Sequence, residues 1–120
     1  GAKVVVAARR ANEIEEVAQK IIDNGGEAIA VTTDVTDDAA MAALAKAAVD
    51  KFGKLTDWVN NAGGLPDATP RYLTKTPEDK WDAQLDLNLK AVFVAMSNLN
   101  FQINKKLERD LYDKITSDNF

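Results

Sequence analysis

Only a few side-chain types could carry chemistry in this chain, because its 120 residues include no histidine and no cysteine. The sequence therefore excludes Ser-His-Asp catalysis, thiolate nucleophiles, disulfides, and zinc sites made of imidazole or thiolate, and we predict no metal site. Acid–base work would fall to carboxylates, lysines or tyrosines. Each of the two tyrosines, Tyr72 and Tyr112, has a lysine close behind it, Lys75 and Lys114 respectively.

Composition and charge limit the partners of the chain. Apolar residues make up 46% and charged residues 28%, which is enough apolar surface to bury a core. The formal net charge of −4 argues against nucleic-acid binding, which needs a basic face. The longest wholly apolar run, Ala39–Ala45, is too short to cross a bilayer, and no signal segment opens the chain. We therefore expect a cytoplasmic protein that binds neither nucleic acid nor membrane.

The elements that must position any site begin with two short apolar runs, at residues 4–7 and 28–31, and a third run at 55–59 that also contains Thr56 and Asp57. Runs of this length, rich in β-branched residues and bounded by polar or glycine positions, are typical of strands buried on both faces of a parallel sheet. The sequence therefore predicts three strands.

Amphipathic runs after these strands predict three helices. The first begins at Asn12 and ends at Gly25, the second begins with Thr36 as its cap and ends at Gly53, and the third begins at Pro77. One face of the third helix is predicted to collect Trp81, Leu85, Asn88, Leu89, Val92 and Met96.

This alternation predicts an α/β fold, a three-layer Rossmann-like parallel sheet with helices on both faces, over residues 1–97. Residues 98–120 have a different pattern. Residues 99–104 alternate apolar and polar side chains like a strand, whereas apolar residues recur every four positions from Ile103 to Ile115, like a helix. Either a short strand precedes a helix from about Lys105, or the preceding helix continues. We expect this tail to complete the same domain.

Four motifs in this order resemble the short-chain dehydrogenase/reductase family. They are Val4-Val5-Val6-Ala7-Ala8-Arg9-Arg10, Asp34-Val35-Thr36, Asn60-Asn61-Ala62-Gly63 and Leu87-Asn88-Leu89. The resemblance covers about four fifths of the chain. It implies the ancestry of an NAD(P)-dependent oxidoreductase with a Rossmann fold.

In that family, the end of the second strand selects the cofactor. Enzymes that prefer NAD place an acidic group there for the ribose 2′-hydroxyl. Here Ala8 occupies that position, and Arg9 and Arg10 follow it. A guanidinium forks onto a 2′-phosphate, so the resemblance implies NADP(H) as the cofactor. The alternative is that both arginines form only a solvated turn before a helix.

The remaining motifs supply the other implied site residues. Asp34 and Val35 match the adenine-contacting pair, and the Asn60–Gly63 turn matches a place where glycine admits close approach of the cofactor. Asn88 matches the active-site asparagine, which holds a water linked to the catalytic lysine; the alternative is that its amide only bonds backbone. The cofactor-binding residues implied are Arg9, Arg10, Asp34, Val35, Asn60, Ala62 and Gly63.

Two motifs of the family are absent from the sequence. No glycine-rich turn of the form T-G-x-x-x-G-x-G is present to meet a pyrophosphate. No Tyr-x-x-x-Lys pair is present either, because Lys75 lies three residues after Tyr72 and Lys114 lies two after Tyr112. We therefore assign no acid–base residue and expect the isolated chain to be inactive.

Relative to the family, we expect the first strand and the C-terminal half to be absent. The first strand is central in the family, and without it the flanking strands would stand about 10 Å apart, with costly unpaired backbone groups. We expect direct pairing of the flanking strands, residues 99–103 or another chain to fill this slot. Open sheet edges would favour a homo-oligomer.

Two interpretations of the whole chain compete. The first is a partial NAD(P)-binding Rossmann domain of oxidoreductase ancestry that keeps some nucleotide affinity. The second is an engineered, shuffled or truncated α/β scaffold, or chimera, that is non-catalytic and binds no cofactor. The sequence leaves open whether the chain is an enzyme.

Overall fold

The fold alternates strands and helices, as its computed structural model shows for residues 1–98. The expectations for residues 99–120, both strand and helix, lie outside the described residues. None of the helices in the described part is long and apolar enough to cross a membrane. The elements are β1 (Lys3–Ala8), α1 (Ala11–Asp23), β2 (Glu27–Thr32), α2 (Asp38–Phe52), a 3₁₀ turn η1 (Leu73–Lys75), α3 (Glu78–Leu85) and a π-helical turn η2 (Asp86–Lys90), with helix continuing over 91–98.

The two strands form a parallel pair, which confirms the α/β class of the fold. Lys3 lies opposite Glu27 and Ala8 lies opposite Thr32, so the register has no offset along the pair. Both strands end at the same edge of the sheet, where the Thr33 N–H donates to the Ala8 carbonyl oxygen at 3.0 Å. The residues that follow the two strands are therefore neighbours in space.

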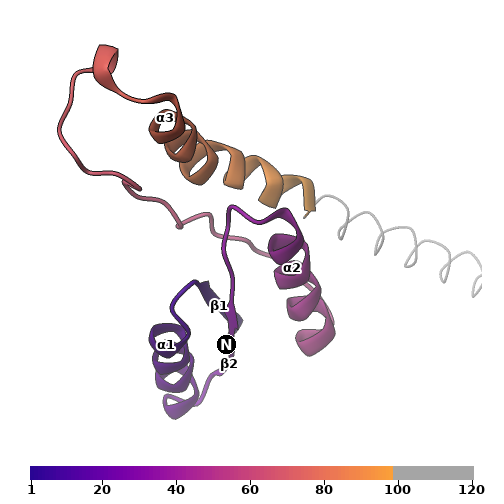
Figure 1. Cartoon of the computed structure of the whole chain (residues 1–120). Coiled ribbons are helices and arrows are strands. Elements are labelled where there is room, and N and C mark those ends of the chain that lie inside the picture. The colour runs from indigo at the N-terminus through magenta and orange to yellow at the C-terminus, as the bar shows by residue number, and fades with distance from the viewer. Residues whose placement is uncertain (99–120) are drawn as a thin grey trace, which may run out of the picture.

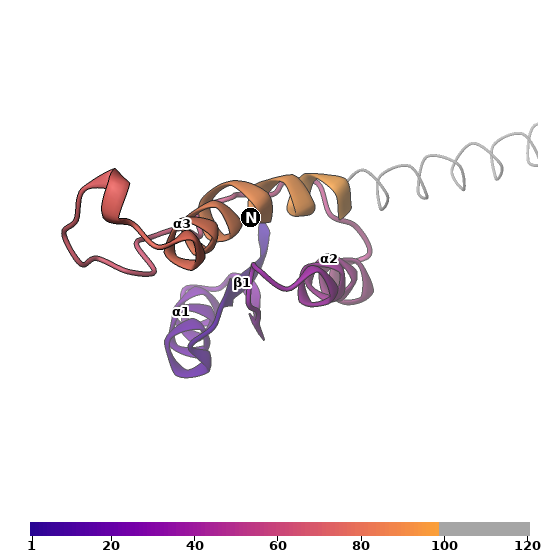
Figure 2. The same ribbon diagram turned by 45° about the horizontal axis from the view of Figure 1, so that its top comes forward.

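Helices cover both faces of this pair, as the predicted three-layer arrangement requires. In two views turned by 45°, β1 and β2 lie between α1 and α2 (Figures 1 and 2). Helix α1 contacts both strands, and α2 contacts β1. Because successive side chains of a strand point to opposite faces, each strand serves both layers.

The core beside α2 sits between that helix, the sheet and the helix at 91–98. Its buried members are Met41, Leu44 and Ala95, with 2%, 6% and 0% of their surface exposed. Val5 and Val31 from the strands pack against them. These contacts hold the helix at 91–98 against the sheet. This helix therefore forms one wall of the candidate site.

The predicted strand at residues 55–59 is wrong. Residues 54–72 form neither strand nor helix, and Val59 has 84% of its surface exposed. A strand needs a neighbour about 4.8 Å away to pair its backbone groups. Within the described residues the sheet contains only β1 and β2, so residues 55–59 have no ladder partner there. Direct pairing of the two flanking segments, one of the expected solutions, does not occur.

The starts of two helices also differ from the predictions. The cap of α2 is Asp37 rather than Thr36, because its carboxylate accepts from the N–H groups of Ala39 and Ala40, at 2.9 and 3.1 Å. Pro77 keeps an extended backbone and precedes α3 instead of forming its first residue. The predicted left-handed stop at Gly53 is confirmed, with φ of 80°.

The buried face of the third helical segment is not the predicted one. Leu89 and Met96 are 65% and 61% exposed, whereas Ala91 and Ala95 are buried. The cause is the turn η2, in which the Ala91 N–H bonds the Asp86 carbonyl five residues back. The π-helical turn contains one residue more than an α-helical turn, so the side chains after η2 point to a different side of the helix. A 3.6-residue pattern that starts before η2 therefore does not predict the buried residues after it.

Candidate functional site

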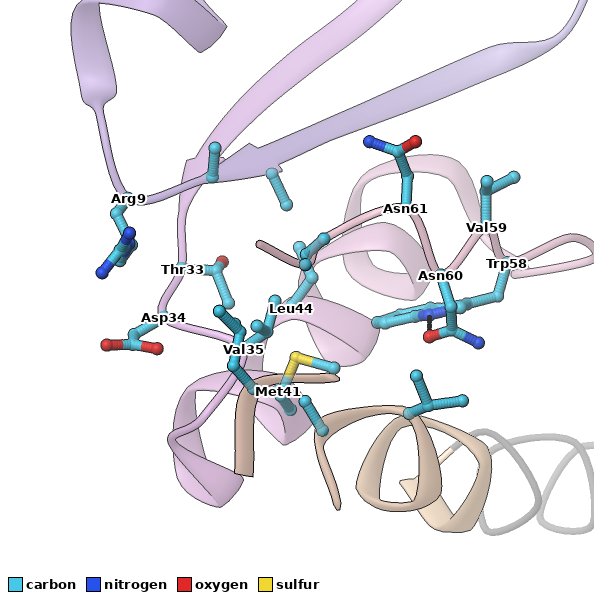
Figure 3. Close-up of a pocket in the computed structure, with 17 residues that line it drawn as sticks. Arg9, Thr33, Asp34, Val35, Met41, Leu44, Trp58, Val59, Asn60 and Asn61 are labelled. Carbon is cyan, nitrogen blue, oxygen red and sulfur yellow. Dashed lines mark hydrogen bonds between the residues drawn. The ribbon is translucent and has the colours of Figure 1, made fainter. Parts of the chain in front are cut away.

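A cavity of about 280 Å³ lies where β1 and β2 end (Figure 3). Its walls come from the ends of both strands, from α2, from the segment that follows residue 57, and from the start of the last helical segment. Every cofactor residue implied by the resemblance lines it except Arg10. The lining residues used below are Ala8, Arg9, Thr33, Asp34, Val35, Trp58, Asn60, Ala62, Gly63 and Leu87.

The two adjacent arginines have different surroundings. Arg9 lines the cavity, on the same side as Asp34 (Figure 3). Arg10 forms an ion pair with Glu13, at 3.0 Å and on the helix surface. Arg9 is therefore the guanidinium available to the cavity, and the prediction that both arginines serve it applies in this structure to Arg9 alone.

Asp34 is held as a carboxylate by its neighbours. Its Oδ1 accepts from the Thr36 hydroxyl at 2.7 Å and from the Thr36 N–H at 2.9 Å. These hydrogen bonds, with a smaller contribution from the nearby Arg9 guanidinium, keep the pKa of Asp34 below its ordinary value. Asp34 therefore presents an ionised acceptor at neutral pH, one oxygen of which is already occupied.

The segment after residue 57 forms the opposite side of the cavity (Figure 3). The Trp58 indole N–H donates to Asn60 Oδ1 at 2.9 Å, and the Asn61 N–H donates to the Val59 carbonyl at 3.1 Å. The side chain of Asn60 thus closes its own turn. The turn continues to Gly63, which lines the cavity with its backbone.

Asn88 joins this turn to the last helical segment. Its Oδ1 accepts from the Gly64 N–H and its Nδ2 donates to the Gly64 carbonyl, both at 3.0 Å. The Asn88 amide thus bonds backbone, and it also donates to the Gln84 side-chain oxygen; the water that the resemblance implies stays a prediction. A Cβ at Gly63 would stand 2.9 Å from Asn88 Oδ1, so a side chain there would disturb this contact.

Several lining residues were not among the predicted site residues, and three of them shape the cavity beside Asp34 and the Asn60–Gly63 turn. Thr33 is 2% exposed and its hydroxyl donates to the Val31 carbonyl at 3.1 Å, so it closes the floor behind Asp34. Trp58 and Leu87 add apolar walls. The sequence signal for Thr33 is a threonine directly after a buried strand; Trp58 lies in the predicted strand at 55–59, and Leu87 belongs to one of the four family motifs.

A second cavity, of about 240 Å³, opens beside the first and shares Arg9, Asp34 and Leu87 with it. Thr36, Pro66, Ala83 and Asp86 complete its lining. The polar pair Arg9 and Asp34 therefore lies between the two hollows. A ligand group bound against Leu87 in the second cavity could therefore contact Arg9 and Asp34 without reaching the buried core residues of the first cavity.

The chemistry of this site is that of binding rather than proton transfer. It offers one guanidinium, one carboxylate, backbone amides and apolar walls. Tyr72 is 83% exposed in the loop before α3 and lines neither cavity. No cluster of three or more potential metal ligands occurs among residues 1–98. These features fit an organic ligand that carries both a planar apolar group and a negative charge.

Comparison with known proteins gives one consistent family. A model described as "short chain dehydrogenase" matches residues 1–106. An uncharacterized oxidoreductase of Listeria monocytogenes is 39% identical over 92 residues, which are 77% of this chain and 36% of that protein. The 3-oxoacyl-[acyl-carrier-protein] reductase of Synechocystis is 40% identical over 95 residues, 78% of this chain and 37% of the reductase.

Solved structures agree with this result. A 3-ketoacyl-ACP reductase from Sinorhizobium meliloti superposes with a TM-score of 0.80 and 31% identity, covering 88% of this chain and 41% of the reductase. A hydroxysteroid dehydrogenase from Escherichia coli gives 0.78 and 31%, covering 88% and 43%. This chain thus spans about two fifths of the length of such proteins.

Proposed function

Since this chain belongs to the short-chain dehydrogenase family, we propose that its cavity binds the adenosine end of NADP(H). The observation that carries the proposal is the gathering of Arg9, Asp34 and the Asn60–Gly63 turn around one hollow. These residues come from three separate parts of the sequence. Their meeting at the carboxyl ends of parallel strands, where ligands bind in open α/β sheets, supports a common ligand site.

The residues present fit this part of the cofactor. Apolar walls such as Val35 and Leu87 suit the faces of an adenine ring, and the free oxygen of Asp34 suits its amino group. A volume of about 280 Å³ is just below the range of roughly 300–1,000 Å³ for drug-sized ligands. The cavity therefore suits a nucleoside rather than a whole dinucleotide.

The preference for the phosphorylated cofactor rests on Arg9. Ala8 leaves the strand end without a carboxylate, and Arg9 places a forked cation beside the cavity. A guanidinium binds a phosphate through charge-assisted hydrogen bonds, whereas a carboxylate there would repel it. Arg9 would hold the 2′-phosphate, while Asp34 and Val35 would hold the base.

The bound cofactor supplies a hydride for carbonyl reduction or accepts one from an alcohol. Relatives of this chain include reductases of 3-oxoacyl groups on acyl carrier protein. For the complete protein we propose an NADP(H)-dependent reduction of this class. In residues 1–98 the described side chains would bind and orient the adenosine end only, and we propose that the isolated chain is inactive.

A titration of the chain with adenosine 2′,5′-bisphosphate and with adenosine 5′-monophosphate tests the proposal. Because a ligand that binds only the folded state raises its stability, the bisphosphate should raise the melting temperature more than the monophosphate does. Equal shifts would contradict the NADP preference. No shift with either ligand at millimolar concentration would contradict nucleotide binding.

A second candidate is a non-catalytic α/β scaffold that keeps these motifs without binding a nucleotide. It is favoured by residues 54–72, which include the Asn60–Gly63 turn but form no strand or helix. A cavity wall formed by a segment without sheet hydrogen bonds is held less firmly than one formed by the end of a paired strand. The absence of nucleotide-dependent shifts in the ¹⁵N spectrum at Gly63 and Asp34 would support this candidate over the first.

A further inference from the structure

Two parts of the cavity wall, far apart in sequence, are joined through one side chain. Gly63 lines the cavity from the turn after residue 57, and Leu87 lines it from η2. Their neighbours Gly64 and Asn88 form two hydrogen bonds across 24 residues. Within residues 1–98 these are the only side-chain hydrogen bonds that span more than four positions.

Asn88 has a second attachment, to Gln84 on the preceding turn of the helix. Asn88 Nδ2 donates to the Gln84 carbonyl at 3.0 Å and to the Gln84 side-chain Oε1 at 3.2 Å. One amino group therefore meets three oxygens, while the amide oxygen receives the Gly64 N–H. Rotating the amide by 180° would place a donor against the Gly64 N–H and an acceptor against all three oxygens.

From this network we infer that Gln84 is a positioning residue for Asn88. Its Oε1 holds the Asn88 amide in the one orientation that pairs with both backbone groups of Gly64. Gly64 adopts a φ of 153°, within the range that side chains rarely adopt, so glycine suits this position. Gln84 is half-buried, whereas Asn88 and Gly64 are exposed, so the acceptor at Gln84 competes with water for the Asn88 amide.

The consequence for the cavity rests on the proposed nucleotide site. By fixing Asn88 and Gly64, Gln84 keeps Leu87 and Gly63 at the separation that forms the wall. The inference concerns an orientation rather than chemistry on a ligand. It can therefore be tested in the free chain, apart from the nucleotide proposal.

The experiment compares Gln84→Leu with Gln84→Glu by ¹⁵N spectroscopy and amide hydrogen exchange. Leucine has similar bulk and helix propensity but no acceptor, whereas glutamate restores an acceptor oxygen at the same place. A matched control is Gln19→Leu, since Gln19 lies on the exposed surface of α1 and bonds only Asp23. Adenosine 2′,5′-bisphosphate is titrated separately into the wild-type chain.

In Gln84→Leu we expect the Asn88 side-chain amide signals to move and the Gly64 N–H to exchange about two- to tenfold faster, the size of one hydrogen bond. Gln84→Glu should restore both signals, and Gln19→Leu should leave them unchanged. Wild-type signals in Gln84→Leu, or a loss in Gln84→Glu equal to that in Gln84→Leu, would overturn the inference.

Two further arms keep the outcomes separate. Should Gln84→Leu fail to fold, Gln84→Ala takes its place, because it also lacks the acceptor; a wild-type exchange rate of the Gly64 N–H in that variant overturns the inference. If the wild-type chain does not bind the bisphosphate, the proposed function is wrong, and the Gly64 exchange rates still decide the role of Gln84.

Discussion

Neighbouring residues of one type can have different roles, as Arg9 and Arg10 show. Arg10 is paired with Glu13 on the surface of α1, whereas Arg9 faces the cavity and the carboxylate of Asp34. Arg9 lies in the bend after the end of β1, whereas Arg10 is the N-cap residue of α1. Cofactor selection is therefore expected to depend on the first arginine alone.

Arg9→Ala tests this dependence directly. We expect the variant to bind adenosine 2′,5′-bisphosphate about tenfold to a hundredfold more weakly, because charge-assisted hydrogen bonds contribute roughly 1.5–3 kcal/mol. Binding of adenosine 5′-monophosphate should change little. Calorimetric titration measures both affinities. Arg10→Ala is the matched control, and an equal loss in that variant would show that the two arginines share the phosphate.

The ionisation of Asp34 gives a second prediction at this scale. Its pKa in the folded chain lies below the ordinary value of 3.8, mainly because of the Thr36 hydrogen bonds. Because the pKa of Asp34 is lower in the folded chain than in the unfolded chain, its ionised form stabilises the fold. This contribution is complete above the pKa of the unfolded chain and is lost as pH falls through the pKa of the folded chain. Acidification below about pH 4 should therefore weaken the turn that contains Asp34.

Thr36→Val should raise the pKa of Asp34, because the variant removes the hydroxyl donor while its N–H remains. Carboxyl ¹³C shifts recorded against pH measure this change. Thr76→Val serves as the control, since that hydroxyl donates to the Tyr72 carbonyl instead. An Asp34 titration midpoint that is the same in wild type and Thr36→Val would show that the hydroxyl bond does not set the ionisation.

At the scale of elements, the start of α2 decides where the Asp34 turn ends. Asp37 caps the helix, and Thr36 turns back to Asp34. A negative charge at this end also favours the helix dipole. In the loop after β2, Thr36 thus bonds Asp34 at the cavity, and the next residue, Asp37, caps α2.

Asp37→Ala should destabilise the chain by about 0.5–2 kcal/mol, the usual cost of losing a helix cap. Thr36→Ala should cost less than roughly 0.5 kcal/mol, as a surface change outside the cap does. Urea unfolding followed by circular dichroism measures both. A larger loss in Thr36→Ala than in Asp37→Ala would identify Thr36 as the cap after all.

At the scale of the whole molecule, small residues let the last helical segment approach α2 and the sheet. Ala91 and Ala95 are 5% and 0% exposed, and Ala95 packs with Met41 and Leu44. No larger side chain fits there without displacing its neighbours. The helix at 91–98 is therefore held against the core through a small side chain, Ala95, packed on the larger Met41 and Leu44.

Ala95→Leu should destabilise the chain by about 1–3 kcal/mol, because extra volume in a packed core forces its neighbours to move. Phe93→Leu, at a position 68% exposed, should change stability by less than roughly 0.5 kcal/mol. Thermal unfolding measures both. Equal stability of Ala95→Leu and wild type would show that this helical segment does not pack on α2 in solution.

Association through open sheet edges remains a prediction. The described sheet has two strands, and the helical surface also carries exposed apolar residues such as Leu89 and Phe93. Both features favour contact with a second copy. Sedimentation velocity should show a species that grows with concentration, and a single monomer boundary at high concentration would contradict the prediction.

Local sequence determined the two parallel strands, the glycine that ends α2 and the motifs that carry the family resemblance. Strand runs such as Val4–Ala7 and stops such as Gly53 depend on side-chain shape and backbone freedom within a few residues. Such features can be read from sequence because their physical causes are near in the chain. Arg9 and Asp34 follow the ends of β1 and β2, and the family resemblance identified them together with the Asn60–Gly63 turn, which follows no strand.

Only the tertiary structure decided the rest. Residues 55–59 have the composition of a strand, yet a strand exists only where another backbone offers its hydrogen bonds, and none does so in the described part. The π-turn moved the buried face to Ala91 and Ala95, and Asn88 acquired its role from a glycine 24 positions away. Pairing, register and long-range hydrogen bonds depend on partners that a local pattern does not contain.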